Sequence, residues 1–218
     1  CGRFSQIAKE VELNIIQFPS GLPPRAAFGL SFPQLFFTLN QFGILGDGFI
    51  QQINESIKLI DSNETSIKGE ANNIADSLCG KLPVLYSEAS LEGVVIRFRQ
   101  QINENSKMLC WHHVIPEMNH NELVGWREEN KKLVVVYLRS EDDNYRNKAR
   151  IEHNKKVIEQ YADSILEIHA KGSSILEKSL YLIHLCYWTS EFIAEKKEID
   201  SVEVNVITGL KNMLSELD

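Results

Sequence analysis

Two polar clusters stand between apolar segments in the middle of this 218-residue sequence. The first is QINENSK, residues 101–107, at the end of a segment with helical character. The second is PEMNHNE, residues 116–122, directly after a short apolar run. Carboxylates, amides and an imidazole can accept, donate and orient protons. The clusters therefore offer Glu104 and His120 as an acid–base pair, with the alternative that each cluster is a solvated end of its element.

Four residues in and beside the second cluster raise the alternative of a metal site: His112, His113, Glu117 and His120. Neighbouring residues on a strand point to opposite faces, so His112 and His113 cannot both bind one ion. The sequence also lacks the HxH and HExxH spacings that often hold zinc. We therefore expect no metal and no other cofactor.

The elements that must position these clusters alternate between strands and helices. Short apolar or β-branched runs predict strands at 82–87, 108–115, 132–139 and 163–170, and helices are expected at 90–105, 143–161 and 173–195. Strands that are apolar on both faces indicate a mainly parallel sheet covered on both sides. The predicted fold class is α/β, a three-layer α/β/α sandwich. Ligands of such sheets bind at the carboxyl ends of the strands, so we expect the site in the strand-to-helix turns.

The amino-terminal part of the chain reads as mostly helical. It begins with the end of a helix at 4–11, followed by a short apolar strand, LNIIQF, at 13–18. A Pro- and Gly-rich corner precedes a helix from about Arg25 to Phe42, and two further helices are expected at 49–60 and 64–78.

Composition limits the kinds of partner and the cellular compartment that we expect for this protein. The net charge of −7 and the pI near 5.5 leave no broad basic surface, so neither nucleic acid nor an anionic membrane is an expected partner. No apolar run approaches the roughly 20 residues that span a bilayer. The four cysteines are widely spaced and form no CxxC motif, which favours reduced thiols in a cytoplasm.

The two clusters together resemble a known family. NENSK followed by PEMNHNE and LVGW resembles the bifunctional phosphoglucose/phosphomannose isomerases of the sugar isomerase (SIS) superfamily. Three other segments are similar to the same family: GLPPRAAFG (21–29), YLRSEDDNYRNKARIE (137–152) and ITGLKNML (207–214). One segment departs from it, because HLCYWTS (184–190) has Tyr187 where the family often has Asp.

The resemblance implies two SIS domains in one chain, each flavodoxin-like. Residues 63–218 are then a second SIS domain, and residues 1–62 are the carboxyl-terminal remnant and helical linker of a first. CGRF (1–4) resembles the trailing edge of a phosphate-binding loop, with Cys1 where Gly is usual. We therefore expect most of the phosphate-binding loops to precede Cys1, and a chain without them to turn over substrate slowly or not at all.

The resemblance also implies a reaction and a role for each of four residues. Glucose 6-phosphate or mannose 6-phosphate becomes fructose 6-phosphate through an enediol, with Glu104 as the base that moves the proton between C2 and C1. His120 serves in ring opening and reaches the active site of a neighbouring subunit, which implies a homodimer. Lys211 assists ring opening or stabilises negative charge, and Arg25 binds the substrate and stabilises the enediolate.

Several secondary roles and one rival function stay open. Asn103 and Asn105 can orient Glu104, whereas Glu117 and Glu122 either fix the tautomer of His120 or cap a helix. The rival function is a non-catalytic sugar-phosphate sensor, because SIS modules also serve as binding domains of regulators. Such regulators do not need the pair of Glu104 and His120, which this sequence has.

Overall fold

A computed structural model describes residues 3–217, which divide into one compact unit ending at Gln51 and a second beginning at Gln52. The first unit holds α1 (Arg3–Glu10), α2 (Phe28–Gln41) and the start of α3 (Gly48–Leu78). Aromatic rings join α2 to the start of α3, since the rings of Phe36 and Phe37 lie 5.6 and 5.2 Å from that of Phe49. Phe49 is buried at this contact.

Two predictions for the amino-terminal part are wrong. The apolar run 13–18 is not a strand: it has no strand partner among the described residues, and Ile15 and Ile16 are about half exposed. The two helices expected at 49–60 and 64–78 are one continuous helix, α3. Ser62 and Asn63 do not break it, because both side chains hydrogen-bond the Leu59 carbonyl within the helix, at 3.1 and 2.8 Å.

The second unit is built on a four-stranded parallel sheet, which confirms the predicted α/β fold class. The strands are β1 (Leu82–Glu88), β2 (Trp111–Ile115), β3 (Asn130–Arg139) and β4 (Ala162–His169), in the order β2-β1-β3-β4. Their register aligns Val84 of β1 with Trp111 on one side and Val135 on the other. All three pairings are parallel, so the carboxyl ends of the strands share one edge.

Strand β2 begins three residues later than predicted. The backbone of Met108 is already bonded to the end of the preceding helix, because its amide donates to the Ile102 carbonyl at 3.3 Å. The Met108 carbonyl in turn accepts from the side chain of Asn103 at 2.7 Å. These bonds keep 108–110 out of the sheet.

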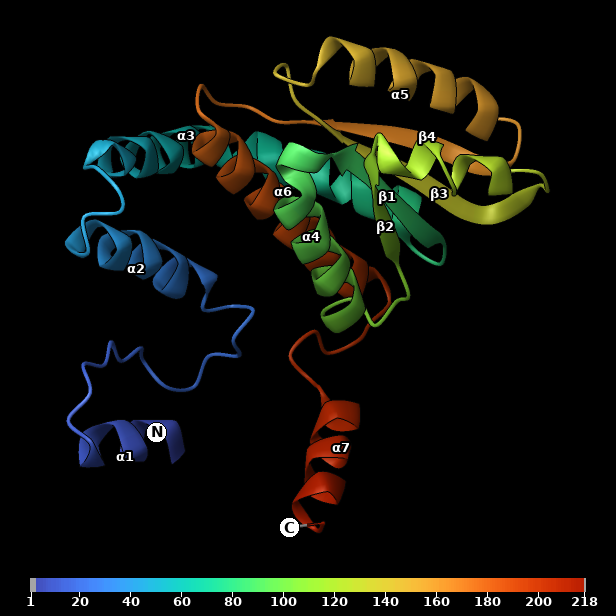
Figure 1. Cartoon of the computed structure of the whole chain (residues 1–218). Helices are drawn as coiled ribbons and strands as arrows, with labels where there is room; N and C mark the ends of the chain where they lie inside the picture. The colour runs from blue at the N-terminus through green and yellow to red at the C-terminus, as the bar shows by residue number, and fades with distance from the viewer. Residues whose placement is uncertain (1–2, 218) are drawn as a thin grey trace. The chain divides into compact units, whose positions relative to one another are not determined.

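Helices cover both faces of this sheet, as Figure 1 shows. On one face, the second half of α3 packs with α4 (Glu92–Glu104) and α6 (Ile175–Lys196) over Leu85 and Val136. On the other face, α5 (Tyr145–Ile158) lies over Val135 and Tyr137. Because both faces are buried, the middle residues of the central strands are apolar on both sides, as the sequence pattern indicated.

Two short 3-10 helices and a terminal helix complete the unit. The 3-10 helices η2 (Glu117–Asn119) and η3 (Leu123–Gly125) follow β2, and a third, η1 (Ala89–Leu91), precedes α4. The terminal helix α7 (Asn205–Ser215) buries none of its residues in the described chain. Across residues 3–217, no helix combines the length and the apolar character needed to cross a membrane.

Candidate active site

Glu104 is the last residue of α4 and is half-buried. The two residues after it turn inward, since Asn105 is 1% exposed and Ser106 is fully buried. Asn105 donates from Nδ2 to Ser190 Oγ of α6 at 2.9 Å, and Ser106 donates from Oγ to the Ser190 carbonyl at 2.8 Å. The alternative that this cluster is a frayed, solvated helix end is therefore wrong for Asn105 and Ser106.

Two lysines bind carbonyls at the end of α4 and just beyond it. Lys197 donates from Nζ to the carbonyls of Ser106 and Lys107, at 2.7 and 3.4 Å. Lys107, with a φ of +50°, folds its own ammonium back onto the Glu104 carbonyl. Cations at this end of a helix are favourable because its free carbonyls carry partial negative charge. The backbone that carries Glu104 is thus held from two directions.

One arginine of the same helix interacts electrostatically with the Glu104 carboxylate. Burial lowers the pKa of Arg97, and the charges of Tyr187 and Glu104 partly oppose that effect. The side chains of Asn103 and Asn105 bind Met108 and Ser190, as described above, so they fix the chain on either side of Glu104.

His120 follows η2 directly and is exposed. The two residues before it face the interior: Met118 is fully buried, and Asn119 donates from Nδ2 to Asn154 Oδ1 of α5 at 2.6 Å. Glu117 accepts a hydrogen bond from Asn121 at 3.3 Å. Among residues 3–217 the imidazole of His120 has no hydrogen-bond partner, so neither glutamate of the cluster fixes its tautomer here.

Glu122 has a different set of partners. It accepts from the hydroxyl of Tyr86 and from Nε1 of Trp111, the latter at 3.2 Å. Trp126 donates to the same Tyr86 hydroxyl at 3.3 Å. Burial and the neighbouring Glu122 raise the pKa of Tyr86. Both roles predicted for Glu122 are wrong, because its carboxylate neither contacts His120 nor caps η3.

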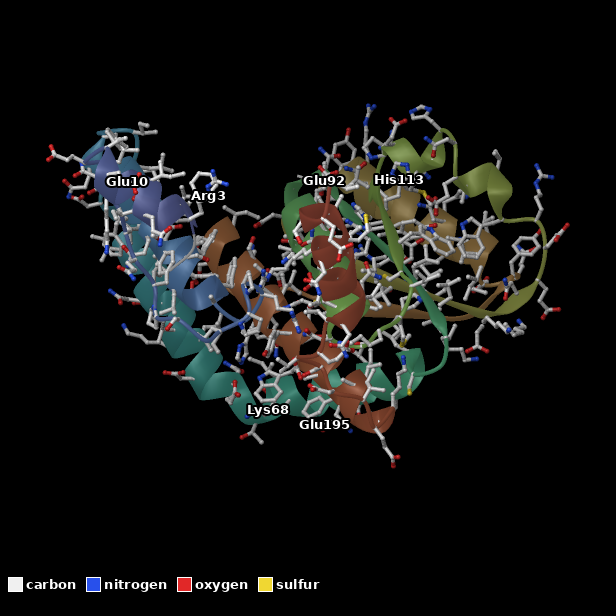
Figure 2. The ribbon with its side chains drawn as sticks, turned by 90° about the horizontal axis from the view of Figure 1, so that it is seen from below. Arg3, Glu10, Lys68, Glu92, His113 and Glu195 are labelled. Atoms are coloured by element: carbon white, nitrogen blue, oxygen red, sulfur yellow. The ribbon has the colours of Figure 1, made fainter. Side chains whose placement is uncertain are left out.

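Glu104 and His120 lie at opposite edges of the sheet in one chain. Helix α4 starts near the carboxyl edge, after β1, and ends near the amino edge, before β2; its 13 residues span about 20 Å. Figure 2 labels Glu92 at the start of α4 and Glu195 near the end of α6, at opposite ends of this helical layer. His120 follows the carboxyl end of β2. One copy of the chain therefore does not bring the two side chains together.

We expected a ligand site in the turns at the carboxyl edge of the sheet. The chain's own carboxylates already occupy part of this edge. Glu88, at the end of β1, accepts from the Asn144 amide at 2.8 Å and from Asn147 Nδ2 at 3.0 Å. The amino end of a helix such as α5 is a natural position for an anion, and here Glu88 fills it.

A partly buried ion-pair network fills the neighbouring turn. Arg139, at the end of β3, is 8% exposed and donates to Asp143 at 3.2 Å and to Glu167. Lys155 of α5 pairs with Glu167 and with Glu152. Burial raises the pKa of Asp143 although Arg139 opposes the shift. These charges satisfy one another and hold β3, β4 and α5 together.

The other two predicted residues, Arg25 and Lys211, belong to elements outside the sheet. Arg25 belongs to the first unit, in the turn before α2, and is half-buried. Lys211 is on α7 and exposed, and its ammonium makes no ion pair among residues 3–217.

Metal-binding geometry is absent from the part of the chain that the structure describes, where no three His, Cys, Asp or Glu side chains are grouped to hold an ion. His112 pairs in register with Leu85 and His113 with Tyr86, residues of the two opposite cores. This confirms that the two histidines face opposite sides of the sheet. A cavity of about 420 Å³ beside Glu122 and Trp126 is lined by neither Glu104 nor His120.

Sequence reasoning did not identify Ser190, Lys197 or Asn154. A signal for the first was present: Thr189 and Ser190 interrupt the apolar stripe of α6 and are both fully buried. Buried hydroxyls need partners, so such an interruption indicates a contact to another element.

Comparison with known proteins finds similarity to phosphoglucose isomerases in both a family model and individual relatives. A family model described as the bacterial phosphoglucose isomerase C-terminal SIS domain matches residues 67–214. A protein of Aquifex aeolicus named bifunctional phosphoglucose/phosphomannose isomerase is 34% identical over 217 residues, which cover 99% of this chain and 66% of that protein. A protein of the same name from Caldicellulosiruptor bescii is 31% identical, with 99% and 67% covered.

The fold also has a counterpart among solved structures. A hypothetical protein of Thermus thermophilus aligns with a TM-score of 0.74 at 14% identity, over 99% of this chain and 60% of that one. Compared with the two curated relatives described above, the chain spans about two thirds of their length.

Proposed function

The chain belongs to the family of bacterial phosphoglucose isomerase C-terminal SIS domains, and on this basis we propose that it forms part of a phosphosugar isomerase. The proposed reaction interconverts glucose 6-phosphate and mannose 6-phosphate with fructose 6-phosphate. The names of the two curated relatives support this substrate class. No cofactor is needed, because the reaction moves protons within one sugar.

Glu104 is the proposed base, and the observation that carries the assignment is how its backbone is held. Asn105 and Ser106 are buried and bound to Ser190, while the carboxylate of Glu104 itself is half-buried. A base must be held within hydrogen-bond reach of the carbon-bound proton that it moves. The end of α4 meets this requirement better than a solvated helix end does.

His120 is the proposed ring-opening group, and it serves the substrate of a second subunit in a homodimer. Its exposure and its position at the sheet edge opposite Glu104 support a site that two copies complete. Lys211 and Arg25 are the proposed groups that stabilise negative charge on the sugar. Their ammonium and guanidinium suit the enediolate oxygen.

We further propose that residues 1–62 end a first SIS domain and that residues 63–218 form a second. The match of the family to 67–214 and the greater length of the relatives support this division. The proposed location is the cytoplasm, in keeping with the three unpaired cysteines of the described residues, Cys79, Cys110 and Cys186.

Replacement of the base tests the function directly. In the full-length protein, Glu104→Gln keeps the shape of the side chain but cannot accept the carbon-bound proton, so we expect fructose 6-phosphate formation to fall at least about 10³-fold. Binding of sugar phosphate should persist. Isothermal titration and a coupled assay measure the two quantities.

The matched control is Glu92→Gln, at the other end of α4, which should keep wild-type turnover. Wild-type turnover in Glu104→Gln would exclude Glu104 as the base. Binding without turnover in the unmutated protein would instead favour the non-catalytic sensor.

A further inference from the structure

Asn154 of α5 lies beneath the turn that carries His120. It is fully buried, and its Oδ1 accepts from Asn119 Nδ2 at 2.6 Å. Its Nδ2 donates to the sulfur of Met118 at 3.4 Å. One side chain of α5 thus contacts the two residues that precede His120.

Few other hydrogen bonds hold this turn. Its backbone bonds are short-range, from Asn119 N to the Pro116 carbonyl at 3.0 Å and from His120 N to the Glu117 carbonyl at 2.9 Å. Strand β2, which leads into the turn, is an edge strand paired only with β1 among the described strands. The other amide atom of Asn119, Oδ1, is buried without a hydrogen-bond partner among residues 3–217. The side chain of Asn119 therefore depends on Asn154 for its polar contact.

Met118 and Asn119 point towards the interior, and this orientation determines that the side chain of His120 points outwards. Met118 packs into the core with Ile151 of α5, and Asn119 is bound to Asn154. His120 follows them and is exposed. If Asn119 were released, the backbone could rotate between the buried Met118 and the exposed His120.

We propose that Asn154 is a positioning residue for ring opening, which it serves by holding the 117–119 turn so that His120 reaches the sugar ring. This inference rests on the proposed isomerase function. In ring opening the C1 hydroxyl of the aldose loses its proton, C1=O forms, the bond from C1 to the ring oxygen breaks, and that oxygen gains a proton. His120 must approach an oxygen to about 3 Å for this exchange. A displacement of about 1 Å can cost about 10²-fold in rate.

An open-chain substrate separates ring opening from the later proton transfer. The compound 5-deoxyfructose 6-phosphate lacks the hydroxyl that closes the ring, so its C1 proton can exchange with solvent without any ring opening. In the full-length protein we expect Asn154→Leu, which keeps the branching of the side chain but makes no hydrogen bond, to lower turnover of fructose 6-phosphate at least about tenfold. Deuterium uptake at C1 of the open-chain compound, followed by NMR, should stay within about twofold of wild type.

Three further variants complete the experiment. Asn119→Ala removes the same bond from the surface side and should show the same substrate dependence even if Asn154→Leu folds poorly. Asn154→Asp keeps the acceptor for Asn119 and should restore much of the turnover. Asn147→Leu is the matched control, because Asn147 is also buried on α5 but binds Glu88 instead; its rates should match wild type on both compounds.

Equal losses on both compounds in Asn119→Ala, or no loss on fructose 6-phosphate, would overturn the role of Asn154. Failure of the isomerase function gives a different result: the unmutated protein would exchange neither compound, or Glu104→Gln would exchange both.

Discussion

At the scale of single residues, hydrogen bonds of neighbouring residues hold the backbone beside the two proposed functional side chains. Glu104 lies next to the buried Asn105, which binds Ser190, and His120 lies next to the half-buried Asn119, which binds Asn154. A buried amide that loses its partner costs about 1–3 kcal/mol, so each bond restricts the chain strongly. The hydrogen bonds that fix the backbone at both places are made by these neighbours of Glu104 and His120.

The ion pairs at the carboxyl edge make stability depend on pH. Burial alone would raise the pKa of Glu167, but Lys155 and Arg139 outweigh it, so the pKa lies below the usual glutamate value. A carboxylate with a lowered folded pKa stabilises the protein above its unfolded pKa, about pH 4.3, and loses that contribution as the pH falls through the folded value.

Glu167→Gln should therefore destabilise the protein by about 2 kcal/mol at neutral pH, because it leaves the buried Arg139 with one fewer counter-charge. The difference from wild type should shrink as the pH falls below about 4. Urea unfolding at a series of pH values measures it. The raised pKa of Asp143 acts in the opposite direction but is common to both proteins.

Glu152→Gln is the control for this prediction. Glu152 contacts the same Arg139 and Lys155, but its side chain is 55% exposed. Exposed ion pairs contribute about 0–1 kcal/mol. A loss of stability in Glu152→Gln as large as that in Glu167→Gln would show that burial does not determine how much each ion pair of the network stabilises the protein.

At the scale of elements, helix ends and strand starts depend on side-chain hydrogen bonds. Helix α6 begins with a variant of the capping box, in which Ser174 Oγ accepts from the Glu177 amide at 3.2 Å and the Glu177 carboxylate accepts from the amide of Ser173, the residue before the N-cap, at 3.0 Å. Gly172 lies against this box with a φ of +125°, and a Cβ there would lie 2.6 Å from Cβ of Glu177.

Two glycine substitutions should have opposite effects on stability. Gly172→Ala should cost about 2 kcal/mol or more, because it strains the backbone and displaces Glu177 from the cap. Gly69→Ala, in the middle of α3, should stabilise the protein by about 0.5–1 kcal/mol, since a Cβ there meets no atom within 4 Å. Thermal unfolding of both variants measures the difference. Equal changes of the same sign would contradict the capping argument.

At the scale of the whole molecule, the proposed site needs two copies of the chain. Glu104 lies at the amino edge of the sheet and His120 at the carboxyl edge, so in the proposed homodimer each chain contributes the two residues to two different sites. Mixing two inactive variants of the full-length protein tests this arrangement.

A mixture of Glu104→Gln and His120→Ala subunits should regain about a quarter of wild-type activity. Random exchange makes half of the dimers mixed, and each mixed dimer has one intact site of two. The assay follows fructose 6-phosphate after the variants are unfolded and refolded together. Refolding each variant alone is the control, and a mixture as inactive as its components would place both side chains in one subunit.

Local sequence patterns predicted which helices and strands the second unit contains better than they predicted where each one begins and ends. The alternation of apolar strands and longer helices was sufficient for the parallel sheet, because strands buried on both faces must be apolar throughout. The start of β2 and the continuity of α3 were not predictable in this way, because side chains such as Asn103 and Asn63 take up backbone groups locally. The run 13–18 has strand composition, but composition does not supply a strand partner.

The sequence by itself determined the family and the two candidate residues, because NENSK and PEMNHNE are specific strings whose meaning does not depend on folding. It also determined the α/β class through its apolar periodicity. Only the tertiary structure decided that Glu104 and His120 lie at opposite edges, and that Ser190 and Asn154 hold their neighbours. These bonds join residues 85 and 35 positions apart, so they depend on how α4, α5 and α6 pack on the sheet.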